Sequence, residues 1–426
     1  MITTYKEGVK EFGDIVARID GILGKLKARN APRSDIYFWE ATGKYYKRAH
    51  EANIEGKPLC CNGLFGPREL LVAMDIPFYS AENHGIFAVQ SQPDIAVKLF
   101  NKAEAYGLSS DICSPHRAAL GLALEGMVPR PAFIFSTSAT CDQTLKLYEL
   151  FQEYYKCPAF LFDNPYTISR DGLDYARGEV KKLIAFLEEQ SGKKLDYDRL
   201  KEVLELSRIA HDYWMKISDL RRTVPCPISG RESLKDFSVM LTSCGTSEAV
   251  DYFRARYEEI AARVAQGKGV VEKEKYRVAW LYVLPLFDLK ICDWLEENYG
   301  AVIVVDNWAY MMRGIELDPS NPVEFLVNRD IRLGFFTCSY IEDNKGGLSK
   351  MMAELCSDYH ANMAIVLAHF SCNQYCGAIK LIKDEIAKEM GIPFFILDGD
   401  ILDSRVLSSP QMKDRLAEFF SIVEGR

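Results

Sequence analysis

Apolar runs of strand length alternate with helical patterns in two separate stretches of this chain. The first stretch contains PAFIFSTSATC and PAFLFDNPY, and the second contains YRVAWLYVL, AVIVVDNW, MAIVLAHF and PFFILDGD. Strands without a polar face are typical of sheets covered on both sides, and strands that alternate with helices pair in parallel. The sequence therefore predicts an α/β protein with two Rossmann-like parallel-sheet units.

Helical patterns occupy the regions outside these units. The N-terminal stretch is amphipathic, and long patterns such as YDRLKEVLELSRIAHDYWMKI fill the part between the units. We predict an N-terminal helical region (1–55), a first α/β domain (56–168), a helical connecting region (169–270) and a second α/β domain (271–426). A chain of 426 residues is long enough for this organisation.

Charge and hydropathy argue against several classes of protein. The net charge of −8 disfavours a nucleic-acid surface, and no apolar run is long enough to cross a bilayer. The N-terminus carries acidic residues and lacks the pattern of a signal peptide, so we expect a cytoplasmic protein that binds neither nucleic acid nor membrane. The absence of a GxxxxGK(S/T) loop and of a GxGxxG turn after a strand disfavours ATP or dinucleotide binding by those motifs.

Three of the twelve cysteines are distinguished by their positions. Cys141 and Cys372 each follow a predicted strand and precede a helix, and Cys113 lies in SSDICSPHRAALG. Disulfides are disfavoured in the cytoplasm, and a helix start stabilises a thiolate, the form that binds iron or zinc. The long, irregular spacing matches neither a ferredoxin nor a paired-cysteine zinc site. From the residues alone, a metal site and plain packing are both open.

Four further cysteines fall in segments near these loops. Cys60 and Cys61 are expected in the loop after the first strand. Cys338 lies in GFFTCSYIEDN, and Cys376 follows Cys372 by four residues and can face the same way on a helix. These thiols are either additional ligands or the lining of a pocket.

One carboxylate and three histidines lie close to the same loops. Glu82, in YSAENHG, follows a predicted strand and can act as a general base or as a helix cap. His84, His116 and His369 can shuttle protons, although a single histidine is more often structural.

Three longer segments resemble the 2-hydroxyacyl-CoA dehydratase and benzoyl-CoA reductase family, in the manner of its catalytic subunits. They are GLSSDICSPHRAALG, FIFSTSATCDQTLKLYELFQEYYKCPAFLFDNPY and the C-terminal run that starts at MAIVLAHFSCNQYCGAIK. The resemblance extends from about Gly56 to the end of the chain. It implies an iron–sulfur lyase or a low-potential reductase.

The resemblance also implies a mechanism and its components. Cys113, Cys141 and Cys372 would hold a 4Fe–4S cluster with one open iron, and Glu82 would transfer a proton beside it. Single electrons would come from a separate ATP-hydrolysing 4Fe–4S activator, and an acyl-CoA would lose water, or be reduced, through a ketyl radical. The family further implies a dimer, either with a related subunit or with a second copy.

Two departures from the family pattern keep alternatives open. Leu64 stands where the catalytic dehydratase subunit has a serine near the open iron. With Cys60 or Cys61, Cys338 and Cys376, the chain also has enough thiols for a double-cubane 8Fe–9S cluster. The alternatives are therefore a homodimeric double-cubane protein that reduces small molecules with ATP-driven electrons, and a non-catalytic electron-relay subunit.

Overall fold

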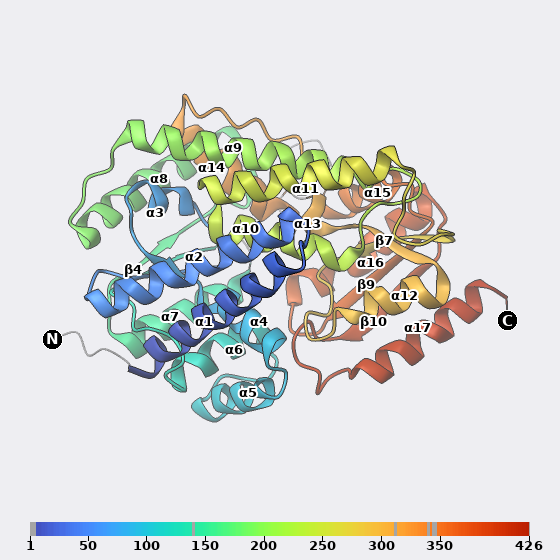
Figure 1. Cartoon of the computed structure of the whole chain (residues 1–426), viewed down its shortest axis with the longest axis horizontal. Helices are drawn as coiled ribbons and strands as arrows, with labels where there is room; N and C mark the ends of the chain where they lie inside the picture. Colours follow the sequence, from blue (N-terminus) through green and yellow to red (C-terminus); the bar gives the residue numbers. More distant parts are fainter. Residues whose placement is uncertain (1–5, 139–140, 311–312, 339–340, 343–346, 426) are drawn as a thin grey trace.

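The computed structural model describes residues 6–138, 141–310, 313–338, 341–342 and 347–425, with backbone alone for 6–9, 309–310, 332–338 and 341–342. The described chain forms two four-stranded sheets, each parallel throughout, and a set of long helices. In Figure 1 the first α/β unit lies at the left, the second lies at the right, and helices α9 and α11 run along the top. The predicted fold class is confirmed.

The first sheet has the strand order β2–β1–β3–β4. Its strands are β1 (Cys60–Asn62), β2 (Phe78–Tyr79), β3 (Phe133–Thr137) and β4 (Ala159–Phe162). Its helices are α3 (Arg68–Ala73), α4 (Ala81–Ser91), α5 (Ile95–Tyr106), α6 (Ser114–Leu124) and α7 (Asp142–Tyr155). All residues of β1 and β3 are buried, because both strands are central and apolar side chains cover both faces of the sheet.

The second sheet has the strand order β10–β9–β6–β7. Its strands are β6 (Tyr276–Leu281), β7 (Ala301–Asp306), β9 (Met363–His369) and β10 (Phe394–Gly399). Its helices are α12 (Lys290–Tyr299), α13 (Asn307–Tyr310), α14 (Pro322–Cys338), α15 (Leu348–Asp358), α16 (Asn373–Glu389) and α17 (Ser409–Val423). When the strands are numbered within each unit, both sheets have the order 2-1-3-4.

The remaining helices cover the two units. They are α1 (Lys6–Ala28), α2 (Arg33–Glu55), α8 (Arg170–Ser191), α9 (Tyr197–Leu220), the short 3-10 helix η1 (Gly230–Glu232), α10 (Ser233–Ser243) and α11 (Ser247–Ala265). Helix α2 packs against α1, α10 and α11, and α11 packs against α9. A small parallel ladder pairs β5 (Thr167–Ile168) with β8 (Ile341–Glu342). Within the described part of the chain, none of the helices combines the length and the apolar character that a bilayer span requires.

The strand order determines where a ligand can bind. In an open parallel sheet, ligands lie at the carboxyl ends of the strands, where neighbouring strands connect in opposite directions. In the order 2-1-3-4 this point falls between the first and third strands, which are β1 and β3 in one unit and β6 and β9 in the other. The loops that follow these four strands are therefore the expected place for a ligand.

Candidate active site between the two units

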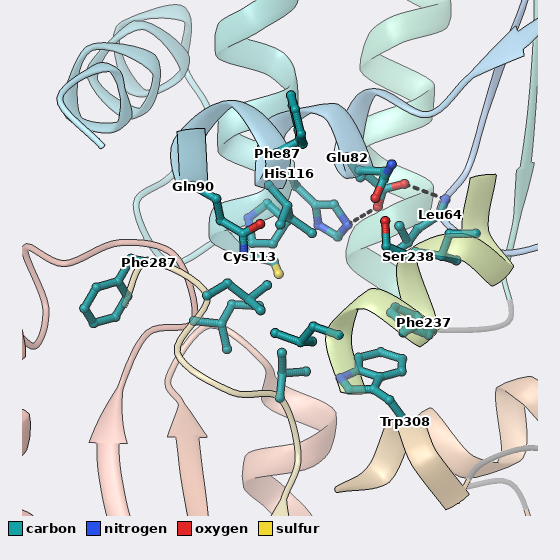
Figure 2. A pocket seen from close by; sticks show the side chains of 18 of the residues that line it. Leu64, Glu82, Phe87, Gln90, Cys113, His116, Phe237, Ser238, Phe287 and Trp308 are labelled. Carbon is teal, nitrogen blue, oxygen red and sulfur yellow. Dashed lines mark hydrogen bonds and ion pairs between the residues drawn. The ribbon is translucent and has the colours of Figure 1, made fainter. Parts of the chain in front are cut away.

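A cavity of about 810 Å³ lies where the strand-end loops of both units meet. Leu64 follows β1, Cys141 follows β3, Tyr282 follows β6 and Cys372 follows β9, and all four line this cavity. Helix α10, from the predicted connecting region, supplies a further part of the wall. Figure 2 shows Cys113 and Glu82 on the side of the first unit, with Phe237 and Trp308 across from Glu82.

All three leading cysteines line this cavity. Cys113, Cys141 and Cys372 each occupy the position immediately before a helix, at the starts of α6, α7 and α16. Burial raises the pKa of all three thiols, that of Cys141 to about 11. Proximity to Cys141 and Cys372 raises the pKa of Cys113 further. The three thiols are therefore within electrostatic reach of one another, and a bound cation would be needed to hold them as thiolates at neutral pH.

The spacing of these thiols bears on what they can hold. Among the residues with described side chains, no three His, Cys, Asp or Glu side chains converge tightly enough for a single metal ion. An iron–sulfur cubane is larger than an ion and holds its cysteine sulfurs farther apart. Three cysteines that line one cavity supply the thiol ligands that such a cluster uses. Their role as ligands stays a prediction.

Glu82 lies in the first turn of α4 and is hydrogen-bonded through both oxygens. Its Oε1 is 2.7 Å from His116 Nε2, and its Oε2 accepts hydrogen bonds from the Leu64 N–H at 2.8 Å and the Tyr148 hydroxyl at 2.9 Å. Burial raises the pKa of Glu82, but these hydrogen bonds outweigh it, so the pKa lies below its usual value. Ser80 is the N-cap of α4, so the cap interpretation of Glu82 is wrong. Figure 2 shows this carboxylate at the cavity wall.

His116 extends the network from Glu82 toward a cysteine. Because the ionised Glu82 can only accept, His116 Nε2 carries the proton between them. The same nitrogen is 3.4 Å from Thr144 Oγ1, and Thr144 Oγ1 is 3.4 Å from Cys141 Sγ. A continuous polar path therefore joins the carboxylate to one of the three thiols.

His369 and His84 differ sharply in their surroundings. His369 Nε2, at the end of β9, is 3.3 Å from Cys113 Sγ, so it links a residue of the second unit to a thiol of the first. Burial lowers the pKa of His369, although Asp400 acts in the opposite direction. His84 instead contacts the Tyr46 hydroxyl at 3.1 Å, and burial lowers its pKa to about 3. His84 does not line the cavity and is a packed, neutral core residue.

Of the remaining candidate cysteines, Cys60, Cys61 and Cys376 do not line the cavity. The expectation that Cys60 and Cys61 lie in a loop is wrong, because both belong to β1 and are fully buried. Cys376 lies one turn into α16, where its thiol donates to the His369 carbonyl at 3.1 Å. Cys338 is the last residue of α14, and its side chain lies outside the described residues.

Several residues of the site have no sequence motif that marks them. Phe237 and Trp308 form an aromatic wall with ring centroids 4.0 Å apart, and Phe65 stacks on Trp308 at 6.1 Å. Tyr282 has a φ of +85°, a conformation that is costly for a residue with a side chain, and its N–H donates to Asn307 Oδ1 at 3.0 Å. Each of these contacts joins segments far apart in the sequence.

Comparisons with known proteins give a consistent result. Residues 64–423 match the family described as 2-hydroxyglutaryl-CoA dehydratase, D-component. The chain is 27% identical to the (R)-phenyllactyl-CoA dehydratase alpha subunit of Clostridium sporogenes, over 89% of this chain and 93% of that protein. It is 28% identical to a subunit of benzoyl-CoA reductase from Thauera aromatica, over 76% and 79%. It is 24% identical to the (R)-2-hydroxyisocaproyl-CoA dehydratase alpha subunit of Clostridioides difficile, over 89% and 94%.

Proposed function

Because this chain belongs to the 2-hydroxyglutaryl-CoA dehydratase D-component family, we propose that it is the iron–sulfur component of a 2-hydroxyacyl-CoA dehydratase-like enzyme. The observation that carries the proposal is the meeting of three partly buried thiols and one buried, ionised carboxylate at a single cavity. The family's relatives are dehydratases and a reductase of acyl-CoA thioesters, as their names state. This supports enzymatic activity on the same class of substrate.

The three cysteines and the carboxylate would have different roles in the reaction. Cys113, Cys141 and Cys372 would hold a 4Fe–4S cluster, which supplies single electrons and a Lewis-acidic iron when bound. An electron on the thioester carbonyl would give a ketyl radical anion, which would expel the neighbouring hydroxyl as hydroxide. Glu82 would take the proton from the β-carbon, and the substrate radical would then give up its electron, so dehydration would consume no net reductant.

The hydrogen bonds around Glu82 suit this role. The pKa of Glu82 lies below its usual value, so its carboxylate is unprotonated at neutral pH, and the hydrogen bonds that lower the pKa also make it a weaker base. His116 and Tyr148 hold its two oxygens in place, and Phe237 and Trp308 lie across the cavity from it. A well-positioned general base contributes a rate factor of about 10² to 10⁴. A non-catalytic relay subunit would not need such a base in an open cavity.

The lining of the cavity favours an acyl-CoA with an uncharged acyl group. Among the described lining residues, the Lys and Arg side chains are Arg231, Lys235 and Lys290, and Arg231 and Lys290 are exposed where the cavity meets solvent. These cations offer positive charge for the phosphates of coenzyme A, and in the protein alone Arg231 pairs with Asp293 and Lys235 with Asp35. The inner wall around Phe237 and Trp308 is apolar. An apolar acyl chain fits there better than a second carboxylate does.

Two partners follow from the proposal. The chain lacks a nucleotide-binding loop of the GxxxxGK(S/T) type, so ATP-driven electrons would come from a separate 4Fe–4S activator. The names of the relatives describe subunits, so we also propose a dimer, either with a related subunit or with a second copy. The burial of Cys60 and Cys61 in β1 speaks against the double-cubane alternative, which needs six cysteine ligands.

Iron and sulfide analysis with EPR on anaerobically purified protein tests the proposal. About four irons per chain support a single cubane, and about eight support the double cubane. Cys113→Ser should lose the cluster, whereas Cys356→Ser, a buried cysteine of α15 outside the cavity, is the matched control and should keep it. A chain that binds no iron under these conditions would contradict the proposal.

A further inference from the structure

Gln143 lies two residues after Cys141, in the first turn of α7, and only 5% of it is exposed. Its Oε1 accepts a hydrogen bond from the backbone N–H of Cys113 at 2.6 Å. Its Nε2 donates to the backbone carbonyl of Ser371 at 2.6 Å, and Ser371 directly precedes Cys372. One side chain is therefore tied to the segments of all three cysteines.

The chemistry of the side chain explains why it is a glutamine. An amide can donate to a carbonyl and accept from an N–H at the same time, whereas an ionised carboxylate only accepts and an ammonium only donates. The two backbone partners also fix the orientation of the amide, since a flipped amide would face N–H to N–H and oxygen to oxygen. An asparagine has the same amide group as a glutamine, but its side chain is one carbon shorter.

Other contacts also join the two units near Gln143, but they do not include the start of α7. Ser114 Oγ donates to Asp400 Oδ1, and Cys113 Sγ lies 3.3 Å from His369 Nε2. Both contacts tie the start of α6 to the second unit. Gln143 adds the start of α7, which carries Cys141, to the same connection.

We propose that Gln143 is a positioning residue that sets the spacing of the three cysteine ligands across the boundary between the units. Cluster binding is part of the proposed function, so that aspect rests on it. The two hydrogen bonds exist in the protein alone, so the positioning role is also measurable without iron. Residues that orient metal ligands typically change metal affinity by about 10- to 100-fold when they are removed.

Two substitutions separate the two hydrogen bonds. Gln143→Met keeps the length of the side chain and removes both bonds, whereas Gln143→Glu keeps the acceptor for the Cys113 N–H and sets a carboxylate against the Ser371 carbonyl. Gln152→Met is the matched control, because Gln152 is exposed on the same helix. The readouts are the rate of iron release to a chelator and hydrogen exchange in the peptide that contains Cys113.

The positioning role predicts a specific pattern of results. Gln143→Met should release iron about 10- to 100-fold faster than the parent protein and should lose exchange protection at the Cys113 amide. Gln143→Glu should release iron faster but keep that protection, a split that general destabilisation would not produce. Gln152→Met should match the parent protein in both readouts.

Failure of the positioning role and failure of the proposed function look different. If the parent protein holds iron and both Gln143 variants release it at the parent rate, the positioning role is overturned. If the parent protein holds no iron, the proposed function fails, and hydrogen exchange alone decides about Gln143: faster exchange in Gln143→Met supports the role, and unchanged exchange overturns it. If Gln143→Met does not fold, Gln143→Glu decides instead. Faster iron release with retained protection of the Cys113 amide supports the positioning role, and release at the parent rate overturns it.

Discussion

The two parallel sheets share the strand order 2-1-3-4, but the loops after equivalent strands carry different chemistry. The third strand of each unit is followed by a cysteine at a helix start, Cys141 in one and Cys372 in the other. The second strand is followed by a helix whose first turn holds Glu82 in the first unit and Asn307 in the second. The scaffold is thus repeated, whereas the side chains are not.

The difference concentrates proton chemistry in one unit. Glu82 is held by Leu64, His116 and Tyr148, all from the first unit. Asn307 is neutral and accepts from the Tyr282 N–H within the second unit. The second unit therefore contributes one thiol and part of the apolar wall, and the first contributes two thiols and the base. The repeated fold determines where the functional side chains lie, and the residue at each position determines what they do.

The largest effects are expected from replacing Cys141 and Cys372, which occupy equivalent positions in the two units. Cys141→Ser and Cys372→Ser should each lose the cluster and reduce the activity to background, because each removes one of three ligands. Iron analysis and an anaerobic assay of acyl-CoA turnover measure both effects. Cys376→Ser, one turn further along α16, is the control and should retain iron. Full iron content in Cys372→Ser would show that Cys372 is not a ligand.

The pair Glu82 and Asn307 tests the division of labour. Glu82→Gln should lower kcat by about 10²- to 10⁴-fold and leave the iron content unchanged, because it removes a base and no ligand. Asn307→Ala should lose the hydrogen bond from the Tyr282 N–H, which costs about 1 kcal/mol of stability, and should lower kcat far less than Glu82→Gln does. Steady-state kinetics and denaturant unfolding distinguish the two outcomes. Equal losses of kcat in both variants would contradict the assignment of proton transfer to the first unit.

The apolar wall provides a smaller effect that belongs partly to the second unit. Trp308→Leu should raise KM by about 10- to 100-fold for an aromatic acyl-CoA such as phenyllactyl-CoA, because it removes part of the aromatic surface. The effect should be smaller for lactoyl-CoA, which has less apolar surface to bury. Trp294→Leu on α12, outside the cavity, is the matched control. A loss that is the same for both substrates would mean that Trp308 supports the fold rather than the acyl group.

The sequence predicted the scaffold and the leading residues because their signals are local. Apolar runs marked the strands, and Cys141 and Cys372 could be placed at strand ends from their immediate neighbours. Cys60 and Cys61 were misplaced because β1 pairs with β3 from Cys60 onward, a register that depends on a partner strand far along the chain. The family assignment is confirmed, and the ligand roles stay predictions.

The rest of the site depends on long-range packing that no local pattern encodes. Gln143 bonds to Ser371, 228 residues away, and the short segment around it contains no sign of that contact. Phe237 reaches the cavity from α10, in a helical region that has no motif of its own. Such residues could be found only once the two sheets and the connecting helices were placed together.

The smallest expected effect is that of replacing His84, which the sequence alone did not distinguish from His116. His84→Phe should leave activity unchanged, because His84 contacts Tyr46 and Phe12 rather than the cavity, whereas His116→Phe should lower it by freeing Glu82. Loss of the Tyr46 hydrogen bond should cost about 1 kcal/mol at pH 7. Steady-state assays and urea unfolding of both variants measure these effects.

The pH dependence of stability gives His84 a second, independent signature. Unfolded His84 takes up a proton near pH 6.5, but the folded protein takes it up only near pH 3, because burial lowers its pKa. Between these values the unfolded state binds more protons, so stability falls as the pH is lowered. His84→Phe should remove this contribution, and its disadvantage against the parent protein should shrink or reverse between pH 7 and pH 4. An unchanged difference over that range would mean that His84 is charged in the folded protein, and the contrast with His116 would lose its basis.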